Sequence, residues 1–569
     1  MKLDDALYKA FLAELESLEK FRMGYTALHP RAPLGREDQD VRRLIEAMAV
    51  FSARTRLAGQ RALARSTLRL FRQHFPYVLN PMPAMAMLRA VPSQARRFVD
   101  AQELPRGTRV LYSSSKSRNA TQTFTFRTLA PLRLFPLRLA EEPALLPPER
   151  PDRLLLTFET DHPRNQSPGP LLLHINHLNE FRSSLAVHHQ LKETVRKDGA
   201  SVLFDEDFTE KSRGTRFKVA FGAPQVPLPE VAPFEHPIQR VASFLHFPQQ
   251  ELFLELRLPT PPPNWRRFTV CLELKEPWPS ELLLTRDTFV THAVPMVNLQ
   301  QEMTNPIEHD GTKERHSLQH PDPNGGYRVH SVLGVYRMQG KGLRPLKPGA
   351  ITGGADTYEY EHEGQGSERR TWLSMELPEA FAQPVRVAVD ASWYQPCPPD
   401  LDTSGFRVGL ADRFLEGLQW KLVGSLVPSA DNRLEHSHQE LLRLLSLRNQ
   451  RFLNRDELLF VLKALGEALV GEALGGGSYE QRHFRPALER LTSVEHVSKP
   501  FAKSTTGFKY IYRLTFGELD PLMLPVLDLL AAQLQELLKV WSTEHVVELT
   551  VLLPHLGNKE LHYPREVER

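Results

Sequence analysis

Proline is the feature that most limits what this chain can fold into. It accounts for 46 of the 569 residues, about 8%, where about 5% is usual. Because proline fixes φ and has no amide hydrogen, it interrupts helices and central strands. We therefore expect many short elements joined by stiff loops. The length suggests about three to four folded units, and a hydrophobic content of 41% is sufficient for real cores.

The charge balance and the cysteine count exclude several classes of protein. The 71 Lys and Arg against 68 Asp and Glu leave +3, so binding of nucleic acid driven by bulk charge is not expected. Two cysteines, Cys271 and Cys397, exclude a disulfide framework and a Cys-rich zinc site. The acidic N-terminus and the lack of a long apolar run predict a cytoplasmic protein without direct membrane insertion.

Two amphipathic helices are expected in the first hundred residues. In the first helix, Leu3, Leu7, Phe11, Leu15 and Leu18 share one face, and the helix should end near Gly24. The second should start after Asp38 or Asp40 and reach Phe71, with an apolar stripe that consists of Leu44, Ile45, Met48 and Phe51. Its arginine-rich face suggests an acidic partner or nucleic acid, but we interpret it as a solvated surface because no basic groove accompanies it.

The middle of the chain is expected to be rich in strands. Alternation of apolar and polar residues, typical of strands, recurs between 104 and 139 and again further on. The pattern predicts one helix, from Asn179 or Ser183 to Lys197, and loops at 304–326 and 340–370. Strands are expected at 123–129, 154–160, 171–176, 251–258, 268–274, 328–338, 370–377 and 385–391.

The last third changes to helices followed by a small mixed unit. Leucines from Leu434 onward predict one helix, and Asn454 should cap a second. Gly475–Ser478 is expected to be a flexible joint. A strand (508–516), a helix (521–541) and a strand (546–553) follow. The predicted fold class is therefore α+β and multi-domain, with helical (1–100), β-rich (101–280), second β-rich (281–415) and C-terminal α+β (416–569) segments.

The search for an active site returns few candidates. No phosphate-binding glycine loop, GxSxG elbow or HExxH helix occurs. His309, Asp310, Glu314, His316 and His320 are grouped, and His316 and His320 have the spacing of two ligands on one helix. Prolines and Gly311 argue against that helix, so we expect no metal, no cofactor and no catalytic residue. Cys397, flanked by prolines, is interpreted as part of a rigid turn rather than as a nucleophile.

A series of short motifs nevertheless resembles one family over nearly the whole chain. The order and spacing of these motifs are similar to those of TssF, the large baseplate wedge subunit of type VI secretion systems. Three segments depart from its pattern, near Val241, Gln300 and Ser392. The motifs are Tyr8–Leu18, His29-Pro30, Asp40–Arg54, Phe75–Met85, Leu104–Thr108, Phe124–Thr128, Ala242–Pro248, Pro295–Leu299, Gln419–Leu426 and Phe508–Leu553.

The resemblance implies a structural protein of a contractile injection machine and not an enzyme. It implies assembly with a TssG-like subunit, a second copy of the same chain, a TssK-like adaptor and a TssE-like sheath initiator. Small-molecule substrates and nucleic acid are not implied as partners. The adaptor would dock the wedge at the cytoplasmic face of the inner membrane. The wedge would hold the sheath extended and then let it contract.

The N-terminal helices are the expected partner surface. Each apolar stripe can be buried against the other in a hairpin, but a wide lateral surface remains. The segment that follows is broken by prolines and cannot easily supply a third helix. We therefore expect a partner chain to contact Phe11, Leu15, Leu44, Ile45, Met48 and Phe51.

Three alternatives remain open at this point. The helices could instead dock on the β modules of the same chain. The chain could be a wedge protein of a phage tail or of an extracellular contractile particle. It could also be a metal-dependent or carbohydrate-active enzyme that uses the His309–His320 loop.

Overall fold

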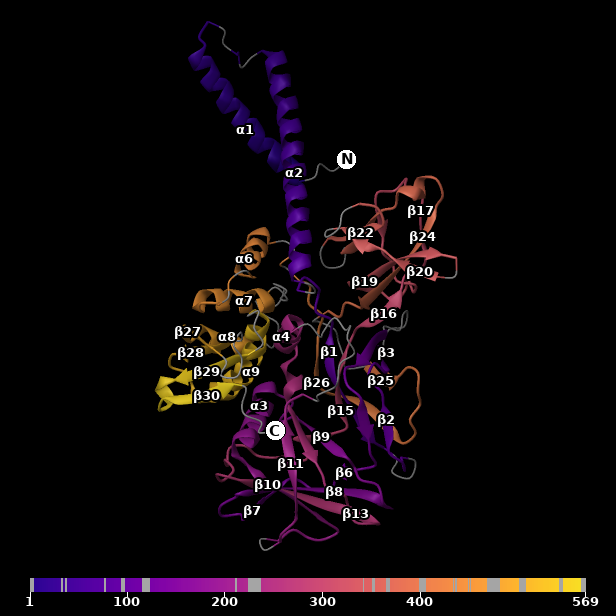
Figure 1. Ribbon diagram of the computed structural model, residues 1–569, viewed down its shortest axis with the longest axis vertical. Coiled ribbons are helices and arrows are strands. Elements are labelled where there is room, and N and C mark those ends of the chain that lie inside the picture. Colours follow the sequence, from indigo (N-terminus) through magenta and orange to yellow (C-terminus); the bar gives the residue numbers. More distant parts are fainter. Residues whose placement is uncertain are drawn as a thin grey trace. The chain divides into compact units, whose positions relative to one another are not determined.

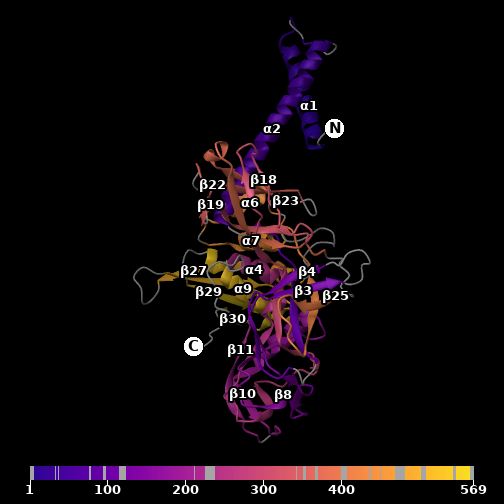
Figure 2. The same ribbon diagram turned by 90° about the vertical axis from the view of Figure 1, so that its right-hand side faces the viewer.

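The computed structural model combines helices at the N-terminus with β-rich modules and a mixed C-terminal module (Figures 1 and 2). The fold is thus α+β, as predicted. The chain forms two compact units, one of residues 1–76 with 435–445, and one of 77–434 with 446–569. The structure describes residues 5–563 except 32–33, 36–37, 76–77, 94–97, 115–122, 210–211, 224–236, 341, 350–353, 365–368, 399–405, 433, 435–436, 449, 451, 468–480, 501–507 and 542–545.

The first unit contains a helical hairpin. Its helices are α1 (Asp5–Leu28) and α2 (Gln39–His74). The carboxylate of Asp38 accepts hydrogen bonds from the amides of Asp40 and Val41 and so caps α2, as the sequence predicts. The helix α1 continues beyond Gly24, its predicted end, to Leu28, because a single glycine weakens a helix without stopping it.

A closed barrel lies in the second unit and joins strands that are far apart in the sequence. Its strand β1 pairs with β15 on one side and with β26 on the other. These strands come from all four segments into which we divided the sequence. The division of the chain into four domains stays a prediction. In barrel order the strands are β1 (Met85–Pro92), β15 (Ala293–Val297), β4 (Thr123–Thr128), β3 (Arg109–Ser114), β25 (Phe406–Leu410) and β26 (Leu418–Val427).

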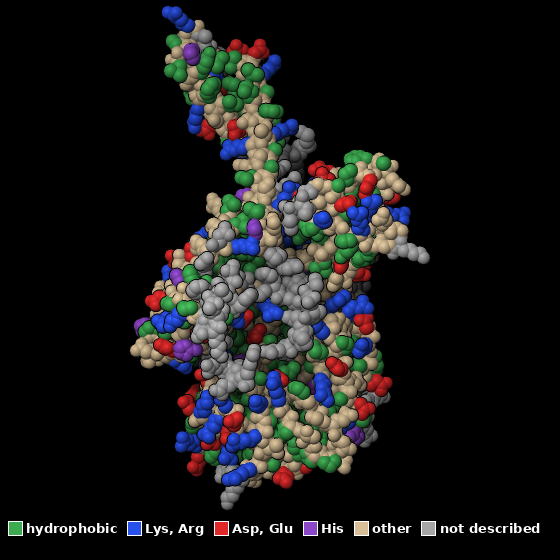
Figure 3. All heavy atoms as spheres, in the orientation of Figure 1, with side chains coloured by type: hydrophobic (Ala, Val, Ile, Leu, Met, Phe, Trp, Pro, Cys, Tyr) green, Lys and Arg blue, Asp and Glu red, His purple; other side chains and the backbone are tan. Residues whose placement is uncertain are grey.

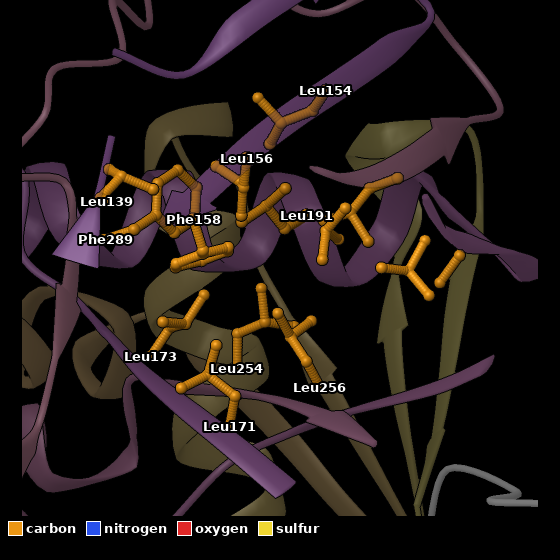
Figure 4. Close-up of a cluster of buried hydrophobic side chains, with 14 of the residues drawn as sticks. Leu139, Leu154, Leu156, Phe158, Leu171, Leu173, Leu191, Leu254, Leu256 and Phe289 are labelled. Carbon is orange, nitrogen blue, oxygen red and sulfur yellow. The ribbon is translucent and has the colours of Figure 1, made fainter. Parts of the chain in front are cut away.

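A long antiparallel sheet follows the barrel and surrounds a large core. Figure 4 shows leucines of β8 facing leucines of β9 and β12, with Leu191 of the helix α3 (Phe181–Thr194) in the same cluster. The alternating burial of these strands follows the period-two pattern of the sequence. In sheet order the strands are β14 (Phe289–Thr291), β9 (Pro170–Ile175), β12 (Phe253–Arg257), β11 (Thr215–Phe221), β10 (Val195–Phe204), β13 (Trp265–Leu274), β8 (Arg153–Arg164) and β6 (Arg138–Leu139), and β7 (Ala144–Leu146) also pairs with β8.

The structure corrects two predictions about the middle of the chain. The expected helix is present as α3, but it ends at Thr194, three residues before Lys197, and the chain continues directly as β10. The expected loops at 304–326 and 340–370 contain short strands, because pairing with well-formed neighbours can stabilise a strand of weak intrinsic preference. These strands are β17 (Ile307–His309), β18 (His316–Ser317), β20 (Gly342–Pro345), β21 (Lys347–Pro348) and β22 (Thr357–Glu363).

The short strands complete two small sheets that share one core. Leu373 of one sheet and Val387, Val389 and Trp393 of the other belong to the same buried cluster. One sheet consists of β16 (Gln300–Met303), β24 (Val385–Tyr394), β19 (Arg328–Gln339) and β20, with β17 beside β24. The other consists of β18, β23 (Arg370–Glu376), β22 and β21, and a separate pair joins β2 (Gln102–Leu104) to β5 (Leu132–Leu134).

The C-terminal module packs helices on a four-stranded sheet. Its central helix, α9 (Leu524–Trp541), contacts α3, α4 and α8 as well as the strand β29. The expected cap of α7 is present, since the Asn454 side chain accepts from the Glu457 amide and the Glu457 carboxylate accepts from the Asn454 amide. The other elements of the module are α4 (Pro237–His246), α7 (Arg455–Glu467), α8 (Gln481–Glu489), β27 (Leu491–Pro500), β28 (Phe508–Phe516), β29 (Val547–Leu553) and β30 (Lys559–Tyr563), whereas α6 (His438–Arg448) belongs to the first unit as far as residue 445.

The sequence predicts this module only in part. The strands at 508–516 and 546–553 and the helix at 521–541 are confirmed within a few residues. The strands β27 and β30 and the helices α4 and α8 were missed. The predicted joint at Gly475–Ser478 lies outside the described residues.

Candidate interaction surface and buried polar clusters

The two helices of the hairpin meet through small residues of α2. Ala49 and Ala53 are fully buried, and small side chains let two helices approach closely. On the same face, Ser52 and Arg56 donate hydrogen bonds of 2.9 Å each to the carboxylate of Glu14. The guanidinium of Arg56 and the hydroxyl of Ser52 hold the pKa of Glu14 below its usual value. This polar pair fixes the register of α1 on α2.

A different face of α2 carries large apolar side chains that remain exposed. Leu44, Met48 and Phe51 are 61%, 53% and 74% exposed, and their spacing places them in one row along the helix. We call these three residues the α2 stripe. Figure 3 shows hydrophobic side chains gathered over the hairpin. Exposed apolar side chains that cluster in this way mark an interaction surface more often than singly scattered ones do.

The structure divides the six predicted partner residues into two groups. Phe11 and Leu15 of α1 and Ile45 of α2 are half-buried, whereas the α2 stripe is exposed. The sequence allows the apolar stripe of α2 to be buried against α1, but in the structure Ile45 is its one half-buried residue, and Ala49 and Ala53 are the fully buried positions nearby. Sequence reasoning also missed Tyr8 and Leu12 of α1, which are 48% and 44% exposed.

The histidines of the 309–320 stretch do not converge on one point. Nδ1 of His309 and Nε2 of His316 are 2.9 Å apart and share a hydrogen bond, and burial lowers the pKa of both rings. The ring of His320 instead stacks on Tyr327 and lies 3.0 Å from the carboxylate of Glu302. His316 and His320, although four residues apart in the sequence, therefore have different partners and do not form one site.

Another cluster has the composition of a metal site. Among the described residues, the one group of three His, Cys, Asp or Glu ligand atoms within 4.8 Å of one another is His189, Glu193 and Asp528. Asp528 is 2% exposed, and Lys192 donates a 2.9 Å hydrogen bond to one of its carboxylate oxygens. The hydroxyl of Tyr563 donates to the other oxygen. Because the ammonium group already neutralises Asp528, this arrangement fits an ion pair that joins α3, α9 and β30 better than it fits a divalent cation.

Neither cysteine is suited to nucleophilic chemistry in this structure. Cys271 and Cys397 are both buried and unpaired. Burial raises the pKa of each thiol to about 12, so the reactive thiolate form is scarce at neutral pH. Cys397 lies in the barrel core, where the sequence had placed a rigid turn.

Several buried histidines are held in the neutral form. Burial lowers the pKa of His174, His246 and His292 to about 4 and that of His188 and His330 to about 3. The Nε2 atom of His292 accepts a hydrogen bond from the Phe135 amide, which requires the unprotonated nitrogen. An unfolded chain would take up protons on these rings near pH 6.5.

We predict that the free energy of unfolding falls as the pH drops from 6.5 towards 4, because the unfolded chain then binds more protons than the folded chain. For each such histidine the slope is about 1.4 kcal/mol per pH unit. His292→Gln should reduce the measured slope by about that amount in urea titrations. The exposed His555 provides the matched His→Gln control. An unchanged slope in His292→Gln would contradict the assignment.

We predict that Lys192→Met lowers the free energy of unfolding by about 1.5–3 kcal/mol, because it removes the closest cation from the buried Asp528 carboxylate, which keeps Tyr563 and the more distant His189 at 3.5 Å. The double variant Lys192→Met/Asp528→Leu should recover most of the loss. Lys539→Met removes a partly exposed pair with Glu536 and should cost less than about 1 kcal/mol. Denaturant unfolding measures all three. A Lys192→Met variant that is no less stable than the control would show that the cluster is not an ion pair.

Comparison with known proteins agrees with the resemblance seen in the sequence. The cryo-electron microscopy structure of the type VI secretion system TssK-TssF-TssG baseplate subcomplex contains a chain with a TM-score of 0.71 and 16% identity, and the match covers 93% of this chain and 99% of that chain. The baseplate complex from the type VI secretion system contains a chain with a TM-score of 0.55 and 17% identity, with 96% of each chain covered. At these identities the two structures establish the fold.

The family is established by the sequence itself. A search of curated proteins finds no match. The family model "Type VI secretion system, TssF" matches residues 4–372, which is well over half of the chain. The chain therefore belongs to the TssF family of the type VI secretion system.

Proposed function

We propose that this protein is a structural baseplate wedge subunit of a contractile secretion machine. Membership of the TssF family and the similar folds of chains in two baseplate assemblies support this role. The observation that carries it is the α2 stripe, an exposed apolar row on a helical hairpin. A subunit of a permanent assembly buries such a row against its neighbours, whereas a monomer would leave it in water.

The partners proposed here follow from the family and from the surface. The TssK-TssF-TssG baseplate subcomplex contains a chain of similar fold, which supports a TssG-like subunit and a TssK-like adaptor as partners. A second copy of this chain and a TssE-like sheath initiator complete the proposed wedge. We assign the α2 stripe, together with the half-buried Phe11, Leu15 and Ile45, to a helical bundle formed with one or more of these chains.

The proposed role is mechanical and involves no reaction. The chain's buried cysteines pack in its cores, His309 and His316 share a hydrogen bond, and Lys192 and Asp528 form an ion pair, so each of these groups has a structural explanation. A wedge subunit must transmit a change of shape from its neighbours to the sheath. A chain whose polar clusters join separate elements is suited to that task, since such contacts fix the relative positions of the elements.

We place the protein in the cytoplasm, docked at the inner membrane through its partners. One helical segment, Pro521–Lys539, is long and apolar enough to cross a membrane by length and composition. In the fold this segment starts in a short 3-10 turn, Pro521–Met523, and continues in α9, which packs against α3, α4, α8 and β29 and buries Asp528 and Gln535. Those contacts support a core helix of a folded module and not a membrane anchor.

We predict that Met48→Asp/Phe51→Asp weakens assembly with a TssG-like subunit at least a hundredfold, because it would bury unpaired charges at the interface. Both side chains are more than half exposed in the isolated chain, so its far-ultraviolet spectrum and melting temperature should stay unchanged. Co-purification and calorimetric titration measure the effect.

The control for this variant is Leu522→Asp, at a side chain that is 81% exposed outside the hairpin. It adds the same kind of charge and should leave assembly intact. Normal assembly of Met48→Asp/Phe51→Asp, or loss of its isolated fold, would refute the assignment of the α2 stripe to a partner.

A further inference from the structure

A cavity of about 300 Å³ lies where the barrel adjoins the long sheet. Its walls come from the end of β1, from β6, β8 and β14 and from the loop before β14. Four arginines line it, namely Arg89, Arg138, Arg164 and Arg286, and we call it the arginine cavity. Its volume is at the lower end of the range for small-ligand pockets.

The charges in the arginine cavity are not balanced. Arg138 is held by Glu159 at 2.7 Å and Asp161 at 3.2 Å, and the four arginines of the lining exceed its three carboxylates by one charge. The remaining carboxylate of the lining, Asp287, lies 3.7 Å from Arg89 and is 82% exposed, which makes it a weak partner.

The third cation adds to this excess. Arg286 donates a 2.8 Å hydrogen bond to the carbonyl oxygen of Leu139, which is uncharged. Arg89, Arg164 and Arg286 are held less closely than Arg138, since Asp287 lies 3.7 Å from Arg89 and Asp100, outside the lining, is the carboxylate that acts on Arg164. Apolar lining from Phe98, Leu137 and Phe289 keeps the local dielectric low, and this strengthens any electrostatic interaction inside the cavity.

Two donors of these arginines have no acceptor. Among the described residues, Nε of Arg89 and Nη2 of Arg164 are buried without a hydrogen-bond partner. Burial lowers the pKa of both guanidinium groups, and the charges of Asp287 at Arg89 and of Asp100 at Arg164 only partly oppose this shift. A buried donor left unpaired is costly and is rare in native proteins, so an oxyanion that either side chain reaches by turning toward the cavity would be bound favourably.

We propose that the arginine cavity binds an oxyanion, a carboxylate or phosphate group, through Arg89 and Arg164. Planar guanidinium groups bind such groups through two parallel hydrogen bonds, which are stronger than those between neutral partners. The oxyanion is either a free small anion or the side chain of an Asp or Glu from a partner subunit. This site is separate from the α2 stripe and goes beyond the proposed wedge role.

The first test uses the isolated full chain, with inorganic phosphate and succinate as probes. Ionic strength is held constant with sodium chloride, because charge screening alone would otherwise change stability. We expect a saturable rise in melting temperature and a calorimetric binding signal for at least one probe. Arg89→Gln/Arg164→Gln should weaken that binding at least tenfold.

Two further variants separate binding from a structural role. Arg257→Gln, at an exposed arginine paired with Glu255, should bind the probe as the wild type does. Arg164→Lys keeps the charge but loses the planar geometry and should also bind at least tenfold more weakly. Without the probe, Arg89→Gln/Arg164→Gln should melt no lower than the wild type, because it removes two desolvated cations, each with one buried donor that lacks an acceptor.

The proposal is wrong if neither probe raises the melting temperature more than sodium chloride does at the same ionic strength. It is also wrong if the double variant or Arg164→Lys binds the probe as tightly as the wild type does. The same titration on the assembled complex with a TssG-like subunit identifies the source. Loss of phosphate binding on assembly indicates a partner carboxylate, and retained binding indicates a free anion. Failure to assemble would count against the proposed function and leave the isolated-chain result standing.

Discussion

The second unit depends on the strand β1, which pairs with β15 along one edge and with β26 along the other. Met85 pairs with Val297 on one side and with Val427 on the other, so one strand brings the middle and the last third of the chain together. Closing the barrel removes exposed strand edges, which would otherwise recruit other chains. The long sheet, the two small sheets and the C-terminal module are all connected through segments that leave or enter this barrel.

Local signals in the sequence predicted many of the helices and strands, but they did not predict which strands pair with one another. The caps at Asp38 and Asn454 and the alternation at 508–516 act within a few residues, so their predictions match the structure closely. Barrel closure depends on contacts between distant segments, which no periodicity reveals. The end of α3 at Thr194 was missed for a related reason, since the residues that follow it are held as a strand by their pairing with β13.

The candidate sites show the same division. A period of 3.6 residues identified the apolar positions of α2, but it could not show that Ala49 and Ala53 would form the contact with α1 and leave Leu44, Met48 and Phe51 exposed. The arginine cavity had no sequence signal at all, because Arg89, Arg164 and Arg286 meet only after the barrel and the sheet have formed. The apolar stripe of one helix can be predicted from the sequence, whereas a site formed by distant strands can be recognised only in the folded structure.

The accessibility of the α2 stripe in the assembled state shows whether a partner chain covers it. Because both native cysteines are buried, Phe51→Cys can be labelled selectively with a maleimide, and Leu522→Cys gives the matched exposed control. Labelling rates are measured on the isolated chain and after assembly with a TssG-like subunit. A partner on the stripe predicts at least tenfold slower labelling of Phe51→Cys on assembly and an unchanged rate for Leu522→Cys. Equal rates for Phe51→Cys in the free and assembled states would contradict the account.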